Sequence, residues 1–277
     1  MLRESVLRVS CVLLIALAWS GTARTDTGLI GWWTFDEGSG TIAHDSSGLG
    51  NDGTFGPEGT PQWIAGYRGG AIHLGGSDDY VNINAVANDM PANNNFTISA
   101  WIRTTTGDGN VIGSNNTASD HDFIFGLASN GQLLVEADSV RNYPPALNDG
   151  QWHMITYVRN GTTASIYTDG VQVGTETPSG NPAGQARWSI GMEWDSSPSD
   201  EYEGDVDDVR FYNRPLSAAE VQSLLKGESF KAENPSPADG ATDVPRDTAL
   251  SWKAGTLAAT HDVYVGAAFA DVNTASR

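Results

Sequence analysis

Residues 204–220, GDVDDVRFYNRPLSAAE, contain a carboxylate-rich β-strand that runs directly into a capped helix. Apolar and polar residues alternate with a period of two over residues 206–212, as in a strand between two environments. In this register Asp207 shares a face with Val209 and Phe211, the side that we expect to point into a core. A carboxylate among apolar neighbours must be ion-paired, hydrogen-bonded or bound to a cation. The strand therefore predicts a buried acid that needs a partner.

The strand is followed by the signature of a short helix. Ser217 and Glu220 have the spacing of a capping box, in which each residue satisfies a free backbone N–H group at the helix start. Gly227 is placed to stop the helix in a left-handed conformation. We expect one helix over residues 217–225.

Outward from this stretch, residues 28–227 consist of short strand-like runs separated by Gly-rich turns. Asn160-Gly161 and Asp169-Gly170 are favoured in type I′ hairpin turns and predict three adjacent antiparallel strands. The succession indicates an all-β, two-sheet antiparallel jelly-roll sandwich with one short C-terminal helix. The expected strands are residues 29–35, 71–74, 80–83, 96–103, 123–127, 133–137, 152–159, 164–168, 171–174, 188–191 and 206–212.

Residues 1–23 have the pattern of a cleaved signal peptide. Arg3 and Arg8 supply the positive region, residues 9–19 are apolar, and small residues follow at a cleavage site. The apolar run is too short to span a bilayer, so we expect no membrane insertion after cleavage; a retained anchor is the alternative. The single cysteine, Cys11, lies in this segment, so the exported chain is expected to have no disulfide.

The charge balance narrows the range of partners. The chain has 34 acidic and 15 basic residues and a formal net charge of −19. Such a surface repels nucleic acid and anionic membranes and attracts divalent cations. We expect no nucleic-acid partner.

The composition changes after the predicted helix. Residues 228–233 are interpreted as a linker, and residues 234–277 begin with a Pro-, Asp- and Gly-rich stretch followed by strand-like runs at 249–252 and 262–265. A free-standing β-sandwich of this kind needs roughly 90–100 residues. The tail therefore predicts an incomplete module of a larger multidomain chain.

Several motifs follow one another in a characteristic order. They are GWWTFDEGSG at 31–40, DSSG at 45–48, NDGT at 51–54, DYV at 79–81, FTISAWI at 96–102, QWH at 151–153, YTDG at 167–170 and the closing segment 204–215. Together they resemble the laminin-G-like, concanavalin A-like jelly-roll domains that are common in exported bacterial multidomain proteins. The resemblance covers about 200 residues, and the ordered succession is more specific than any single motif. The tail, with NPSPADG at 234–240, resembles the first half of a fibronectin type III-like module.

The laminin-G-like resemblance implies an extracellular β-sandwich, secreted or at the cell surface, often with a structural calcium ion and sometimes with glycan or protein binding. Calcium prefers six to eight oxygen ligands, which loops rich in Asp, Asn and Gly supply. The alternative is that these residues form turns and that the strand carboxylate pairs with a nearby arginine. The predicted metal ligands are Asp36, Asn51, Asp52 and Asp207.

Aromatic side chains in loops are candidates for a glycan site, because a flat ring stacks on the C–H face of a sugar. The alternative is that these rings cover the ends of the sandwich. The predicted ligand-binding residues are Trp63, Tyr143, Trp194 and Tyr202. The tryptophans expected in the core are Trp32, Trp101, Trp152 and Trp188.

The series Glu203-x-Asp205-x-x-Asp208 is similar to the Glu-x-Asp-x-x-Glu strand of some glucanases on this general fold. Retaining glycosidases need two carboxyl groups about 5 Å apart on one face. Here the last position is Asp, one methylene shorter, and the segment fits the closing strand of the laminin-G-like family better. The sequence therefore predicts a non-catalytic binding or adhesion module with a glycan or protein ligand; a structural spacer and a glycoside hydrolase are the alternatives.

Overall fold

The computed structural model describes residues 28–56, 61–77, 79–115, 121–194, 198–227, 233–238, 245 and 248–253. The chain divides into two compact units, of which the larger is Ala23–Glu228. In the other unit, β19 (Glu233–Ser236) pairs with β20 (Ser251–Lys253). The expected signal peptide and most of the expected linker and C-terminal module lie outside the described residues. Among the described helices, none has the length and apolar character needed to cross a bilayer.

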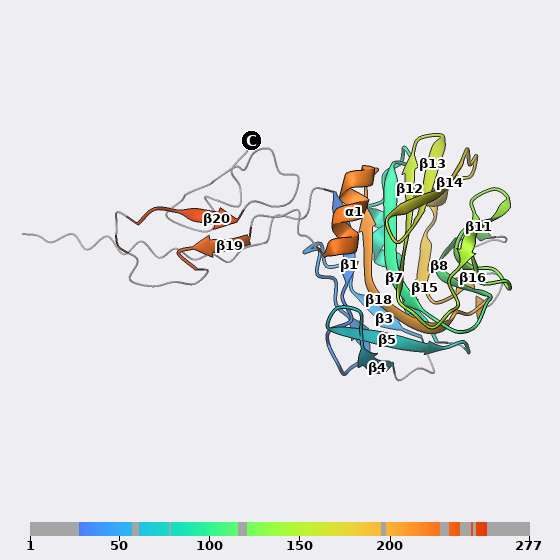
Figure 1. The fold of residues 1–277 in the computed structure, drawn as a ribbon, viewed down its shortest axis with the longest axis horizontal. Coiled ribbons are helices and arrows are strands. Elements are labelled where there is room, and N and C mark those ends of the chain that lie inside the picture. Colours follow the sequence, from blue (N-terminus) through green and yellow to red (C-terminus); the bar gives the residue numbers. More distant parts are fainter. Residues whose placement is uncertain are drawn as a thin grey trace, which may run out of the picture. The chain divides into compact units, whose positions relative to one another are not determined.

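The larger unit consists of two antiparallel sheets (Figure 1). Sheet A has the order β14-β13-β12-β7-β18-β5-β4, with β1 also paired to β18. Its strands are β1 (Leu29–Trp33), β4 (Gln62–Ala65), β5 (Gly70–Gly75), β7 (Phe96–Arg103), β12 (His153–Asn160), β13 (Thr163–Thr168), β14 (Val171–Glu176) and β18 (Glu203–Tyr212). The expected two-sheet sandwich is confirmed.

Sheet B has the order β11-β10-β9-β8-β15-β6-β3-β2. Its strands are β2 (Ile42–Ala43), β3 (Gly53–Phe55), β6 (Val81–Asn82), β8 (Gly109–Asn115), β9 (His121–Leu127), β10 (Gln132–Glu136), β11 (Val140–Ala146) and β15 (Arg187–Ile190). The connections contain two 3-10 helices and a small hairpin: η1 (Asn84–Asn88), η2 (Pro182–Gly184), β16 (Glu193–Trp194) and β17 (Pro198–Ser199).

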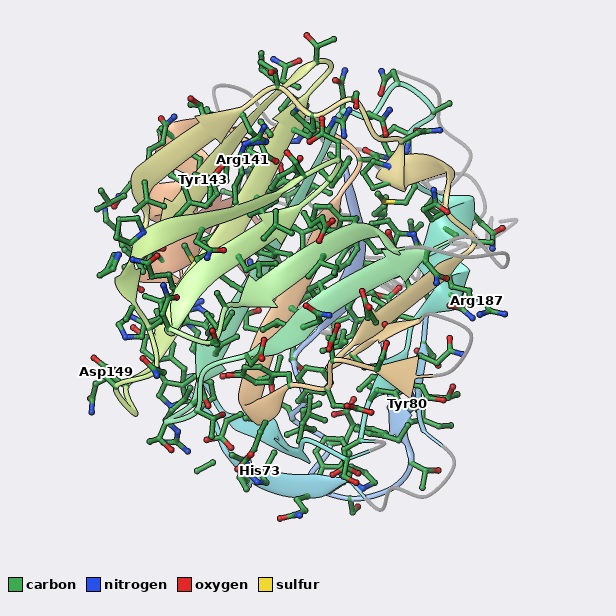
Figure 2. All side chains as sticks on the ribbon, turned by 90° about the vertical axis from the view of Figure 1, so that its right-hand side faces the viewer. His73, Tyr80, Arg141, Tyr143, Asp149 and Arg187 are labelled. Carbon is green, nitrogen blue, oxygen red and sulfur yellow. The ribbon has the colours of Figure 1, made fainter. Side chains whose placement is uncertain are left out.

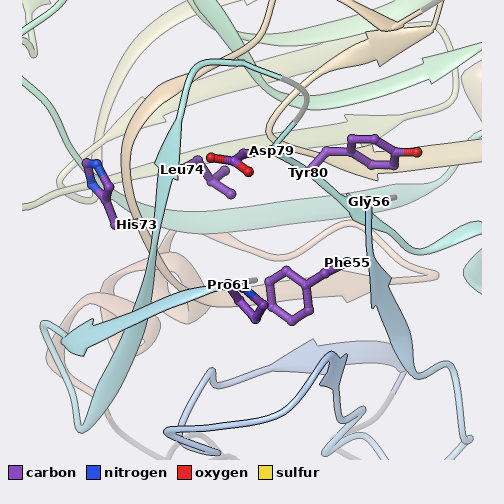
Figure 3. Close-up of a pocket in the computed structure, with 7 residues that line it drawn as sticks. All are labelled: Phe55, Gly56, Pro61, His73, Leu74, Asp79 and Tyr80. Atoms are coloured by element: carbon purple, nitrogen blue, oxygen red, sulfur yellow. The ribbon is translucent and has the colours of Figure 1, made fainter. Parts of the chain in front are cut away.

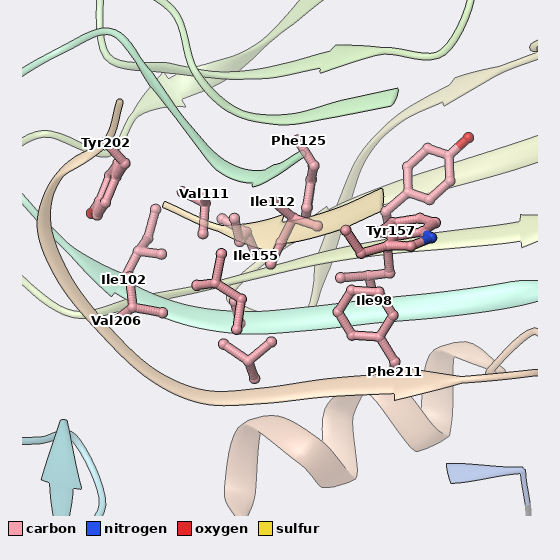
Figure 4. Packing of buried hydrophobic residues seen from close by; sticks show 14 of the residues in the cluster. Ile98, Ile102, Val111, Ile112, Phe125, Ile155, Tyr157, Tyr202, Val206 and Phe211 are labelled. Carbon is pink, nitrogen blue, oxygen red and sulfur yellow. The ribbon is translucent and has the colours of Figure 1, made fainter. Parts of the chain in front are cut away.

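The core lies between the two sheets and is rich in aromatic rings (Figure 4). Phe211 of sheet A meets Trp188 of sheet B edge-to-face, with ring centroids 5.4 Å apart. Trp33 makes a second edge-to-face contact with Phe211 at 5.7 Å. All three side chains are fully buried. Burying a large apolar side chain contributes roughly 1.5–3 kcal/mol, so this inter-sheet packing makes a large contribution to stability.

The predicted helix and hairpins are present. Helix α1 (Ala218–Lys226) begins after Ser217, which forms the expected capping box with Glu220, and it ends at Gly227 with a φ of 71°. Asp169 and Gly170 both have positive φ, as a type I′ turn requires.

The turn between β12 and β13 differs from the expectation. Asn160 is the last residue of β12 and pairs with Thr163, so Gly161 takes the first loop position. Its φ is 61°, which fits a type II′ turn, in which only the first loop residue needs a positive φ.

Candidate functional site

Strand β18 contains a bulge at its carboxylates. Val206 lies opposite Ile102 and Asp207 opposite Trp101, but the register shifts before Arg210. Asp208 lies in the shift with a φ of 47°, in the left-handed region. A bulge places an extra residue in one strand and changes which face the following side chains occupy.

The bulge corrects the predicted orientation of Asp207. The alternation predicted that Asp207 shares the core side with Val209 and Phe211, and the extra residue in the strand makes this wrong. Asp207 instead shares the outer face of sheet A with Trp101, which does not belong to the inter-sheet core. It is nevertheless fully buried. The loop 66–70 and the neighbouring side chains cover the Asp207 carboxylate.

The carboxylate of Asp207 is only partly satisfied. Its Oδ2 accepts the backbone N–H of Arg68 at 2.9 Å. Its Oδ1 is buried and has no hydrogen-bond partner within the described part of the chain. Burial raises the pKa of Asp207 to about 7, against the backbone N–H groups of Arg68 and Tyr67, which favour the ionised form. An oxygen in this state is suited to bind a cation.

Asp36 approaches the same loop from the other side. Its Oδ1 accepts the backbone N–H of Gly70 at 2.6 Å, and its side chain is exposed. Glycines permit the close approach of both acids, because a Cβ atom on Gly69 would lie 2.1 Å from Asp36 Oδ1 and one on Gly66 would lie 2.7 Å from Asp207 Oδ2. The structure thus brings two of the four predicted metal ligands, Asp36 and Asp207, to one loop.

The other two predicted ligands lie in a separate network around Asp45. The Asn51 N–H donates to Asp45 Oδ2 at 2.9 Å, and Asp52 Oδ1 accepts the Asp45 N–H at 2.7 Å. The Asn51 side-chain amide donates to Asp89 at 2.8 Å. Among the described residues, no hydrogen bond or ion pair joins this network directly to Asp36.

This arrangement changes the expected metal site. Over the described ranges, no group of three or more His, Cys, Asp or Glu side chains could hold a metal. A calcium ion at Asp36 and Asp207 would therefore need backbone carbonyl oxygens for most of its coordination, which calcium accepts. The partnerless Oδ1 of Asp207 fits such an ion, whereas Asn51 and Asp52 do not contribute to this position.

Arg68 joins the loop, the bulge and the helix. Its Nη1 donates to Asp208 Oδ2 at 2.9 Å, and its Nη2 donates to the backbone oxygens of Leu224 and Leu225 at 2.9 and 2.7 Å. These are carbonyls of the last turn of α1, where the helix dipole favours a cation. Burial opposes ionisation of Asp208, but Arg210 and Arg68 hold its pKa below the usual value. The outer face of sheet A is thereby fixed around Asp208.

Next to this ion-paired cluster, the outer face of sheet A carries exposed aromatic and basic side chains. Tyr67 is 44% exposed and is the most exposed aromatic side chain among the described residues. Its ring stacks on Trp101 with centroids 3.5 Å apart and planes at 16°. The stack holds the Tyr67 ring in a fixed orientation above the sheet.

A row of side chains crosses the same face of the sheet, two positions along the strands from Trp101, on which Tyr67 stacks. Asp205 lies opposite His73 of β5 and Arg103 of β7. Its two oxygens lie 2.7 Å from His73 Nδ1 and 2.6 Å from Arg103 Nε. The Arg103 guanidinium lies 4.8 Å from the ring centroid of Trp152, which is partly exposed. We call these five residues, Tyr67, His73, Arg103, Trp152 and Asp205, the outer strip.

Two of the predicted ligand-binding residues are wrong because they are buried. Tyr202 is 0% exposed and belongs to the core. Tyr143 is 8% exposed, lies near Arg141 (Figure 2) and donates a hydrogen bond to Glu176 at 3.3 Å. Burial and the charge of Glu176 raise the pKa of Tyr143 to about 12. Neither ring can stack on a sugar.

Trp63 is also not an exposed platform. It packs against the core and meets Phe55 edge-to-face at 5.6 Å. Phe55 lines a small pocket with Pro61 and Tyr80, of about 10 Å³, while the His73 ring points away from it (Figure 3). This volume holds at most a water molecule. The side chain of the fourth predicted residue, Trp194, lies outside the described residues.

The outer strip was not found from the sequence. Trp32, Trp101 and Trp152 were expected in the core, yet among the described tryptophans only Trp188 and Trp33 belong to the inter-sheet cluster. His73 and Asp205 lie on neighbouring strands that are far apart in the sequence, so their pairing has no local sequence signal. The sequence contained one sign of this site: Tyr67 is an aromatic residue between Gly66 and the basic Arg68.

The glucanase-like carboxylates do not form an acid–base pair. Asp205 is held by His73 and Arg103, and Asp208 by Arg68 and Arg210. A general acid needs a raised pKa, but the pKa of Asp208 is lowered. Glu203 is exposed.

Comparison with known proteins gives one family. Residues 75–222 match Laminin_G_3, described as the concanavalin A-like lectin/glucanases superfamily. Comparison with curated protein sequences gives no match.

Solved structures of similar fold come from several sources. Domain 4 of AbnA, a GH43 extracellular arabinanase from Geobacillus stearothermophilus in complex with arabinotriose, is 19% identical with a TM-score of 0.55, covering 72% of this chain and 99% of that one. A Trypanosoma rangeli sialidase mutant displaying trans-sialidase activity is 16% identical with a TM-score of 0.57, over 72% of this chain and 32% of that one. The binding domain of botulinum neurotoxin serotype D/C is 16% identical with a TM-score of 0.53, over 74% and 54%. At these identities the structures show the fold alone, and the family match shows that the chain belongs to the Laminin_G_3 family of concanavalin A-like domains.

Proposed function

We propose that the domain is a non-catalytic extracellular module that binds a glycan through the outer strip. The observation that carries this proposal is Tyr67, a well-exposed ring held flat by its stack on Trp101. A rigid aromatic face beside a few polar groups is the arrangement that sugars use, because the ring meets the sugar C–H face and the polar groups meet its hydroxyls. Arg103 supplies such a group on the same face, two positions along β7 from Trp101, and its guanidinium lies over the Trp152 ring.

Two structures of similar fold support a binding role over the alternatives. The AbnA domain was solved in complex with arabinotriose, and a botulinum neurotoxin binding domain was solved in complex with rat synaptotagmin II. A structural spacer would need no exposed stacked ring, and a hydrolase would need a free acid–base pair of carboxyls. The outer strip therefore favours a glycan ligand.

The test combines binding and turnover on the full chain. We expect binding on a glycan array without release of reducing sugar, and a loss of about tenfold or more in affinity for Tyr67→Ala or Trp152→Ala. Val140→Ala is the matched control, because Val140 is 56% exposed on β11 of the other sheet. Release of reducing sugar would support the hydrolase, and a blank array would support the spacer.

We also propose that a structural calcium ion lies between Asp36, Asp207 and the loop 66–70. When bound, the ion supplies positive charge to a buried carboxylate that the protein satisfies on one oxygen only. Asp207 would hold the ion, and Asp36 would bind it from the exposed side. Export of the chain, and a fibronectin type III-like module after this domain in a larger protein, remain part of the same proposal.

A further inference from the structure

We propose that the outer strip recognises a linear oligosaccharide that carries carboxylates, that is, a chain of uronate sugars. This inference rests on the glycan-binding function proposed above and specifies its ligand. It is carried by the hydrogen-bond donors that the strip leaves unused, by their spacing across the sheet, and by the charges around them.

Arg103 has donors to spare. Its Nε donates to Asp205 at 2.6 Å, while its Nη1 and Nη2 donate to no acceptor in the described part of the chain. The side chain is 37% exposed, and its guanidinium lies over the Trp152 ring. The two terminal nitrogens of a guanidinium match the two oxygens of a carboxylate in a bidentate pair. Asp205 and Trp152 thus hold Arg103 in place, and its Nη1 and Nη2 are available to bind a carboxylate.

His73 adds a second polar group on the same side. Its Nδ1 lies 2.7 Å from Asp205, and its Nε2 has no hydrogen-bond partner within the described ranges. In the tautomer that donates Nδ1–H to the carboxylate, Nε2 is an acceptor, suited to a sugar hydroxyl. The imidazole is 36% exposed, whereas the Asp205 side chain is 12% exposed. The Asp205 carboxylate is therefore covered by His73 and Arg103, and the terminal nitrogens of Arg103 are the donors that face the solvent.

The spacing of these groups suits an extended chain. His73, Asp205 and Arg103 occupy adjacent strands β5, β18 and β7, and Trp152 immediately precedes β12, the next strand. Strands lie about 4.8 Å apart, so the row extends for roughly 14 Å across the sheet. One monosaccharide ring would leave part of this row without contact, whereas a linear chain lying across the strands would follow it.

The net charge of −19 would be expected to repel an anionic ligand. Charges farther than about 8 Å are largely screened at physiological ionic strength, so the nearest groups decide. Glu203 is the opposing neighbour, because it is exposed, lies two residues before Asp205 on β18, and forms no ion pair within the described residues. Its removal should therefore strengthen the binding of an acidic chain.

The experiment compares two probes with the same backbone. Calorimetry on the full chain, with calcium present, measures affinity for an oligogalacturonate and for its methyl ester, which has no charge. We expect the acid to bind about tenfold or more tightly than the ester, because charged hydrogen bonds contribute more than neutral ones. Arg103→Gln should remove this preference and Glu203→Gln should increase it, whereas His73→Asn should weaken the binding of acid and ester alike.

Arg187→Gln serves as the matched control, because Arg187 lies on sheet B well apart from His73 (Figure 2). It should leave both affinities unchanged, and the melting temperature of each variant checks that the fold is intact. Equal affinity for acid and ester, both weakened by Tyr67→Ala, would overturn the uronate inference and leave glycan binding in place. Acid preference that survives Arg103→Gln would place the carboxylate site elsewhere and also overturn it. If neither probe binds and the glycan array is blank, the proposed function fails with the inference.

Discussion

At Asp207, burial disfavours the ionised form of the carboxyl group, and this makes the stability of the protein depend on pH. Its pKa is raised to about 7 in the folded protein, from 3.8 for a free side chain. The folded state therefore holds the proton more tightly than the unfolded state between these values. The free energy of unfolding should fall as the pH rises from about 4 to about 7, and it should level off above that.

We expect Asp207→Asn to remove most of this decline, which is on the order of 4 kcal/mol for a shift of this size. Urea denaturation between pH 4.5 and 7.5, with a chelator to exclude metal, measures it. Asp52→Asn is the control and should keep the decline, because the Asp52 side chain is 47% exposed. A wild-type slope that persists in Asp207→Asn would contradict the assignment.

Arg68 is a second residue with a large expected effect. Its guanidinium joins Asp208 to two carbonyls at the end of α1. Lysine keeps the charge but has no planar fork, so it cannot reach both partners at once. We expect Arg68→Lys to cost about 2 kcal/mol and Arg68→Ala more, measured as a shift of the urea midpoint. Equal stability of wild type and Arg68→Lys would show that the carbonyl contacts are unimportant.

Also at the scale of residues, the sequence identified Asp207 as a carboxylate that needs a partner, but it did not predict which face of the strand Asp207 occupies. The run of alternating residues correctly predicted β18 and the burial of Asp207. It could not predict the bulge, because Asp208 takes a left-handed conformation that asparagine or glycine would have signalled more clearly. One extra residue then moves Asp207 from the core side to the outer face. The outer strip was not predicted for a different reason: its residues are far apart in the sequence and meet only through the pairing of β5, β18 and β7.

At the scale of elements, strands with strong alternation were predicted well. The expected strand at residues 96–103 is β7, and the hairpin strands β12, β13 and β14 were placed within a few residues. Strand β8, GNVIGSN, was missed because glycine, asparagine and serine have low strand propensity. Strand β11 was missed because it contains Pro144 and Pro145, which are tolerated there since β11 is an edge strand. In both cases the neighbouring strand, not local preference, decides the conformation.

The helix cap gives a prediction for a single element. Ser217 Oγ accepts the Glu220 N–H at 3.3 Å, and Glu220 Oε2 accepts the Ser217 N–H at 2.8 Å. Ser217→Ala removes the first of these bonds and should cost about 1 kcal/mol, measured by thermal denaturation. Affinity for any glycan should not change, because the cap does not belong to the outer strip. A lower affinity at unchanged stability would mean that α1 takes part in binding.

At the scale of the whole molecule, the order of motifs predicted the sandwich, since short strands with glycine turns must stack or close to bury their faces. It did not predict which outer face is covered. That depends on α1 and the loop 66–70, which meet on sheet A through Arg68 and Tyr67. Two of the predicted aromatic residues failed for a separate reason: loop position suggested exposure, but Tyr143 and Tyr202 fold inward.

The calcium proposal makes a prediction for the whole domain. An ion that binds only the folded state adds RT ln(1 + [L]/Kd), about 2.7 kcal/mol at a hundredfold excess over Kd. For a domain of this size the melting temperature should rise by roughly 5–10 °C. Chelation should remove this increment, added calcium should restore it, and Asp207→Ala should abolish the response. Asp52→Asn should retain it, because Asp52 bonds to Asp45 in a separate network. If the response is lost in Asp52→Asn and kept in Asp207→Ala, the ion lies at the Asp45 loop instead. If neither chelator nor calcium changes the melting temperature, Asp207 is a buried acid without a metal.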